Sequence, residues 1–162
     1  MPFQPWQPGM TITSGGLQSI SPTWQPWTPT WTTATGAPSY GNATVDCAYA
    51  VAARTVWFRF EIAFGSTTTY GGNGDNWTFG LPIPAASTVF ALGWAELGMT
   101  NGARCMSRIR VGGSTSTLQF EISSGRVDGA AITSTGIIDS LSPWTWGNGG
   151  SIRGTGCYES AT

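Results

Sequence analysis

Carboxylates are the side chains of this sequence best suited to acid–base chemistry, and the chain has eight of them. They are Asp46, Glu61, Asp75, Glu96, Glu121, Asp128, Asp139 and Glu159. Glycoside cleavage would need two of them facing one cleft. Glu61 and Glu121 each stand in a Phe-Glu-Ile triplet, on the strand face opposite a hydrophobic set. We expect solvated charges that pair across strands with Arg59, Arg108 or Arg110, and we predict that the protein is not an enzyme.

The absence of two residue types excludes several kinds of nucleophilic catalysis and cofactor binding. All seven basic residues are Arg, and the sequence has no Lys and no His. Imidazole-assisted nucleophiles, histidine metal ligands, Schiff-base lysines and P-loop lysines are therefore excluded. The three cysteines, Cys47, Cys105 and Cys157, stand far apart, which predicts buried reduced thiols and no metal or other cofactor. A net charge of −1 argues against nucleic acid as a partner.

Signal peptides and membrane-spanning segments are the sequence features that bear on cellular location. The first residues show no basic segment followed by an apolar run, so we expect no signal peptide and synthesis in the cytoplasm. No run of 18 apolar residues occurs, which predicts no membrane partner.

From about residue 44 onwards the hydrophobic residues recur with a period of two, which is typical of β-strands. In the clearest case one face carries Val56, Phe58, Phe60, Ile62 and Phe64. Strands are expected at 44–52, 55–64, 77–81, 88–96, 104–111, 116–122, 137–141 and 151–158. Glycine-rich turns separate most of them, and Ala53-Arg54 is short enough for a hairpin. The sequence predicts an all-β fold, an antiparallel, jelly-roll-like β-sandwich, over residues 35–162.

Residues 1–34 differ in composition from the rest and are predicted to form an extended N-terminal arm. Six prolines in this stretch preclude a regular helix or a central strand. Its tryptophans each offer on the order of 150–250 Å² of surface to bury. The rings must pack on the chain's own domain, on a neighbouring subunit or on a partner. We expect the arm to pack on another polypeptide.

Tryptophan and arginine supply the candidate assembly residues. These are Trp6, Trp24, Trp27, Trp31, Trp144, Trp146, Arg104, Arg108 and Arg110. Both residue types are enriched at protein interfaces. An exposed strand face is the alternative for the arginines, and a glycan-binding site is the alternative for Trp144, Trp146 or Trp77. For Trp57, Trp77 and Trp94 we expect packing in the core or in an interface.

Five segments carry a resemblance to a known group of proteins. They are residues 24–32 (WQPWTPTWT), 38–43 (PSYGNA), 54–60 (RTVWFRF), 64–71 (FGSTTTYG) and 77–82 (WTFGLP). Their order resembles small virion structural proteins of actinobacterial tailed phages and prophages, of the minor tail, tail-fibre tip or capsid decoration type. The likeness covers about residues 22–84, and the C-terminal half agrees in pattern more than in specific residues.

The resemblance implies a trimeric β-sandwich module in a virion and supplies no catalytic motif. Our first hypothesis is a non-enzymatic, tail-associated structural protein, a homotrimer attached to other virion proteins through its arm. The alternative is a capsid decoration protein that binds the major capsid protein. A further alternative, from a different class, is a module that binds a glycan of the host cell surface.

Overall fold

The computed structural model describes residues 21–72, 74–88, 91–122 and 136–161, together with positions 9, 11, 13 and 14. Its strands are β1 (Gln25–Trp27), β2 (Trp31–Thr32), β3 (Thr44–Val45), β4 (Cys47–Ala52), β5 (Thr55–Ala63), β6 (Thr78–Gly80), β7 (Gly93–Gly98), β8 (Arg104–Val111), β9 (Thr117–Ile122), β10 (Gly136–Ile137) and β11 (Ser151–Glu159). No helix long and apolar enough to cross a membrane occurs among these residues. The predicted all-β class is confirmed.

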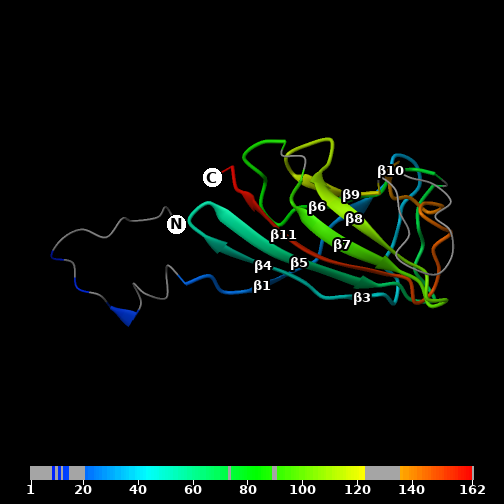
Figure 1. Ribbon diagram of the computed structural model, residues 1–162, viewed down its shortest axis with the longest axis horizontal. Helices are drawn as coiled ribbons and strands as arrows, with labels where there is room; N and C mark the ends of the chain where they lie inside the picture. The colour runs from blue at the N-terminus through cyan, green and yellow to red at the C-terminus, as the bar shows by residue number, and fades with distance from the viewer. Residues whose placement is uncertain are drawn as a thin grey trace.

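All strand pairs are antiparallel, and the strands belong to one continuous sheet with the order β1-β4-β5-β11-β7-β8-β9-β6-β2. The short strands β3 and β10 pair with β5 and β9, outside this path. Figure 1 shows the sheet curling from β4 and β5, in the lower part of the view, round to β8 and β9 above them. The curl encloses one core, which gives the antiparallel, sandwich-like fold expected from the sequence.

The core side of the sheet follows the predicted alternation most clearly in β5. Val56, Phe58, Phe60 and Ile62 are fully buried, whereas Trp57 and Arg59 between them are exposed. The hairpin from β4 to β5 turns at 53–54, as predicted. Ala53 adopts a φ of 51° there, a left-handed conformation that tight hairpin turns require.

The two ends of the strand order are joined by only three residues. β1 pairs with β4, β2 pairs with β6, and residues 28–30 connect β1 to β2. Two hydrogen bonds hold this link in place. The Tyr40 hydroxyl donates to the Pro29 carbonyl at 2.8 Å, and the Gly80 amide donates to the Thr30 carbonyl at 2.8 Å. Residues 25–32, which we call the strap, therefore run from one sheet edge to the other and close the curl.

The strap corrects the predicted boundary at residue 34. Residues 25–32 were expected in an arm that packs on another polypeptide, yet they form two strands of the chain's own sheet. The physical reason is that edge strands tolerate proline, so Pro26 can sit in β1 although a central strand would exclude it. Other predicted strands also differ in length. The one expected at 44–52 is divided into β3 and β4, the one at 77–81 shortens to β6, β7 begins at Gly93, and β10 ends at Ile137.

Candidate functional site

The tryptophans of the predicted arm differ in their exposure to solvent. Trp6 lies outside the described residues. Trp24 precedes β1 and leaves 54% of its surface exposed. Trp27 is half-buried, with its ring edge-on to Phe58 and Phe60 at centroid distances of 6.3 and 5.9 Å. The ring of Trp24 is therefore accessible to another protein molecule, whereas the ring of Trp27 is only partly accessible.

Trp31 is a core residue, which corrects its prediction as an assembly contact. It is 6% exposed, stacks on Phe64 and Phe79 at 5.6 and 5.7 Å, and meets Trp77 edge-on at 4.8 Å. The closing of the sheet brings β2 beside β6, which places Trp31 opposite Phe79. The ring is therefore sheltered by its own domain.

Trp144, Trp146 and Trp77 are also buried, so the prediction of Trp144 and Trp146 as interface residues and the glycan-binding alternative for all three are wrong. Trp77 packs in the core, which is one of the two environments expected for it. The exposed fractions of Trp144, Trp146 and Trp77 are 7%, 5% and 0%. The Trp146 Nε1 donates to the Ser142 carbonyl at 2.9 Å and the Trp77 Nε1 donates to the Tyr70 carbonyl at 3.2 Å. Rings held this way inside the core present no face on which a sugar could stack.

Arg104, Arg108 and Arg110 lie along β8 on the face that also carries Met106, whereas Ile109 points into the core. Strand periodicity explains this division, because alternate residues face opposite sides of a sheet. The exposed strand face considered for these arginines is observed, and their role in assembly stays a prediction.

Strand register assembles one continuous surface around β7 and β8. One row across the sheet aligns Arg59, Thr155, Trp94, Arg108 and Glu121 as successive cross-strand neighbours. The next row aligns Glu61, Arg153, Glu96 and Met106. We call these nine residues the outer face. They come from five strands, β5, β11, β7, β8 and β9, so the sheet fixes their relative positions.

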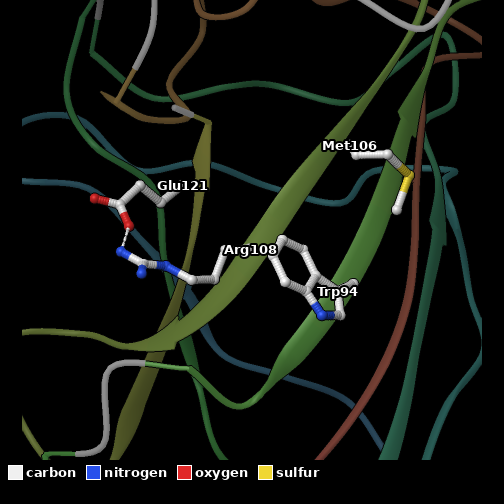
Figure 2. Close-up of a pocket in the computed structure, with 4 residues that line it drawn as sticks. All are labelled: Trp94, Met106, Arg108 and Glu121. Carbon is white, nitrogen blue, oxygen red and sulfur yellow. Dashed lines mark hydrogen bonds and ion pairs between the residues drawn. The ribbon is translucent and has the colours of Figure 1, made fainter. Parts of the chain in front are cut away.

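Trp94 and Met106 are the exposed apolar side chains of the outer face. Trp94 is 62% exposed and Met106 is 47% exposed. A hollow of about 210 Å³ is lined by these two residues together with Arg108 and Glu121, and Figure 2 shows the indole of Trp94 between Met106 and Arg108. A second hollow, of about 510 Å³, shares Trp94 and Met106 and extends towards Glu96 and Arg153. The tryptophan is therefore flanked by hollowed surface on two sides.

The charges of the outer face are paired within the protein. Arg108 donates to Glu121, as the dashed line in Figure 2 marks, and Arg110 lies 3.4 Å from the same carboxylate. The Arg153 Nε donates to the Glu61 Oε1 at 3.0 Å. The hydrogen bond from Arg108 is the main cause that lowers the pKa of Glu121, against the opposing effect of burial. The predicted cross-strand pairing of Glu121 is confirmed, whereas Glu61 pairs with Arg153.

Two further pairs fix the remaining charges beside this surface. Arg59 donates to the Asp46 carboxylate at 2.6 Å, and the Arg104 guanidinium lies 3.7 Å from the Glu96 carboxylate. Every described arginine takes part in such an ion pair. The outer face thus combines a rigid array of donors and acceptors with one large exposed ring.

Burial makes two of the three thiols weak nucleophiles. Cys47 and Cys105 are buried, as predicted, and burial raises the pKa of Cys47 to about 12 and that of Cys105 to about 11. Cys157 is exposed on β11, which corrects its predicted burial. It occupies the strand face of Arg153 and Thr155, where side chains point to solvent. No group of three potential metal ligands occurs among the residues that the structure describes.

Sequence reasoning assigned Trp94 to the core or to an interface and so missed the outer face as a site. A signal was present in the sequence. In Gly93–Gly98 the period of two puts Trp94 and Glu96 on one face and Ala95 and Leu97 on the other. A tryptophan that shares a strand face with a carboxylate is expected to face solvent.

None of the family models, curated proteins and solved structures compared with the chain matches it. The exposed Trp24 beside the strap and the outer face around Trp94 are therefore the features from which a function has to be inferred.

Proposed function

We propose that this protein is a non-enzymatic structural protein of a bacteriophage virion, a homotrimeric, tail-associated β-module attached through the N-terminal segment that precedes the strap. The observation that carries the proposal is the exposure of Trp24. Its indole is 54% exposed, whereas Trp31 is buried and Trp27 is half-buried. The Trp24 ring thus stays available to a neighbouring protein, whereas Trp27 and Trp31 pack against the chain's own sheet.

The position of Trp24 suits an attachment point. It lies between Pro22 and Pro26 and directly before β1, the strand at one end of the strand order. Proline fixes the backbone φ, so a segment of this kind loses little conformational entropy when it docks. A rigid aromatic anchor of this size is typical of residues that dominate binding energy.

The closed sheet and the densely packed aromatic core of the module support a role in a particle outside the cell. The strap closes the sheet, and the core behind it is filled with aromatic side chains that contact one another. The strap pairs with β4 and β6, so the strand order ends in the short strands β1 and β2, and short edge strands protect a β-protein from unspecific pairing. The resemblance of residues 22–84 to phage virion proteins points in the same direction. A closed three-fold assembly lets each copy bury the same surface in a neighbour.

Incorporation into particles tests the proposal. Tagged wild-type chain and a Trp24→Ala variant are expressed during particle assembly, and purified particles, heads and tails are probed for the tag. We expect the wild type on tails and a loss of about tenfold or more for Trp24→Ala. Trp57→Ala is the matched control, because Trp57 is also exposed, at 39%, but lies in β5.

Two outcomes would revise the proposal. Recovery on heads would favour capsid decoration, and equal incorporation of both variants would remove Trp24 from the attachment. Light scattering of the purified chain tests the trimer, for which a mass near three times 17.0 kDa is expected. A clean monomer at 17.0 kDa would contradict a trimer that forms before particle assembly.

A further inference from the structure

We infer that the outer face around Trp94 is a binding site for a neutral oligosaccharide, with one sugar ring stacked on the Trp94 indole. The inference goes beyond the proposed function and does not depend on it. It rests on three observations: the exposure of one ring, the balance of the surrounding charges and the two hollows that flank the ring.

The indole of Trp94 supplies the apolar part of the site. It is the most exposed of the large hydrophobic side chains in the described part of the chain, at 62%. The C–H face of a sugar ring is flat and apolar, as is the face of an indole, so stacking removes both from water. Met106, directly across from Glu96 in the register, adds a flexible thioether beside the ring.

The charges that surround Trp94 favour a neutral ligand. Three arginines and three glutamates line the two hollows: Arg59, Arg108, Arg153, Glu61, Glu96 and Glu121. The formal charges of these six residues cancel, and the three residues that pair with them beside the hollows, Asp46, Arg104 and Arg110, add a net charge of only +1. The surface therefore has no strong preference for an anion or a cation. Guanidinium groups donate hydrogen bonds and carboxylates accept them. Hydroxyl groups do both, and the alternation of the two charged types therefore matches a ligand rich in hydroxyls.

The same charges argue against a protein partner on this face. A protein interface buries a dry core, in which Trp, Met and Arg are common but Glu and Asp are depleted, and three glutamates, Glu61, Glu96 and Glu121, line the hollows of this face. Here Trp94 and Met106 stand alone among ion pairs such as Arg108–Glu121 and Arg153–Glu61. Burying those pairs under a protein would cost their hydration. A sugar leaves part of each charged side chain wet, and its hydroxyls replace the water that it displaces.

The arrangement of the hollows indicates a ligand longer than one ring. Trp94 and Met106 line both of them, so the two hollows meet at the indole. One leads to Arg108 and Glu121, and the other leads across β11 to Arg153 and Glu61. A chain of sugars that stacks one ring on Trp94 reaches polar groups on both sides of it.

Binding of the purified full chain to a glycan array tests the site. The array carries neutral gluco-, galacto-, manno- and arabino-oligosaccharides beside uronic, sialylated and sulfated ones. We expect binding to at least one neutral oligosaccharide, lost roughly tenfold or more in Trp94→Ala. Trp94→Phe keeps a flat ring and is expected to bind more tightly than Trp94→Ala. Trp24→Ala, which removes another exposed tryptophan, at 54%, outside the outer face, is the matched control and is expected to bind as the wild type does.

The remaining outcomes overturn the inference. They are no binding to any neutral oligosaccharide, equal binding by wild type and Trp94→Ala, and binding confined to charged glycans. Light scattering of the same variants adds a second readout. If Trp94→Ala converts an oligomer into a monomer, the outer face is a protein interface and the sugar site is refuted. Incorporation into particles is scored separately through Trp24, so the proposed function and this site can fail independently.

Discussion

Trp27 and Trp31, four residues apart in the chain, pair at opposite ends of the strand order of one sheet. Trp27 lies across from Cys47 of β4, and Trp31 lies across from Phe79 of β6. A connection this short can join the two ends only if the sheet curls until they are near each other. The strap therefore both requires and stabilises the curl.

Truncation tests the strap directly. Deletion of residues 1–20 removes no residue of β1 or β2 and is expected to leave the thermal unfolding midpoint close to that of the full chain. Deletion of residues 1–34 removes both strands and opens both sheet edges, so we expect loss of the cooperative unfolding transition or a large fall in its midpoint. Thermal unfolding followed by circular dichroism measures both. Equal midpoints for the two truncations would show that the strap is dispensable.

Replacement of Trp31 tests the core that the strap completes. Trp31→Ala leaves a cavity among Phe64, Phe79 and Trp77, each within ring-contact distance of the indole. We expect a loss of about 3–5 kcal/mol in the free energy of unfolding, measured by denaturant titration. Trp24→Ala removes an exposed ring and is the control, with an expected change within about 0.5 kcal/mol. Similar losses for the two variants would contradict the assignment of Trp31 to the core.

The central strands could be predicted because a period of two is a local property. The strand expected at 104–111 is observed as Arg104–Val111, and the buried set from Val56 to Ile62 follows the predicted face. The strap could not be predicted in this way. β1 has three residues and β2 has two, too few to show a period, and Trp31 pairs with Phe79, 48 residues later in the chain.

The residues of the candidate site could be predicted only in part from the sequence, because the exposure of a side chain depends on which other segments cover it. Trp144 and Trp146 lie in a loop, where periodicity does not indicate a face, and the structure buries both. Trp94 lies in a strand and could have been placed on the polar face with Glu96. Trp94 lies across from Arg108, and Arg108 lies across from Glu121. This alignment depends on the register of three strands, which no local sequence pattern contains.

Thiol reactivity provides an independent check of burial. Cys157 is exposed, whereas Cys47 and Cys105 are buried with pKa values raised by that burial to about 12 and about 11. Since the thiolate is the reactive form, the two buried thiols are expected to react slowly at pH 8. A colorimetric disulfide reagent should label one thiol per native chain quickly and three per chain in denaturant. Cys157→Ser should abolish the fast phase, and a second fast thiol would contradict the packing around Cys47 or Cys105.

The pair between Arg108 and Glu121 predicts a pH dependence of stability. The hydrogen bond from Arg108 lowers the pKa of Glu121 below its ordinary value near 4.5, so the folded chain binds this proton less tightly than the unfolded chain does. The pair's contribution is then fully present above pH 4.5 and is lost as the pH falls through the lower, folded pKa.

Denaturant titrations at pH 7 and pH 3 of wild type and Glu121→Gln measure this contribution. We expect the wild type to be more stable than the variant by about 1 kcal/mol or less at pH 7, with the difference shrinking at pH 3. Glu159→Gln is the control, because its pair with Arg54 is more exposed, at 61% and 57% of the two side chains, and is screened by solvent. A wild-type advantage that stays constant or grows as the pH falls would show that the Arg108–Glu121 pair does not favour the ionised carboxylate in the folded state.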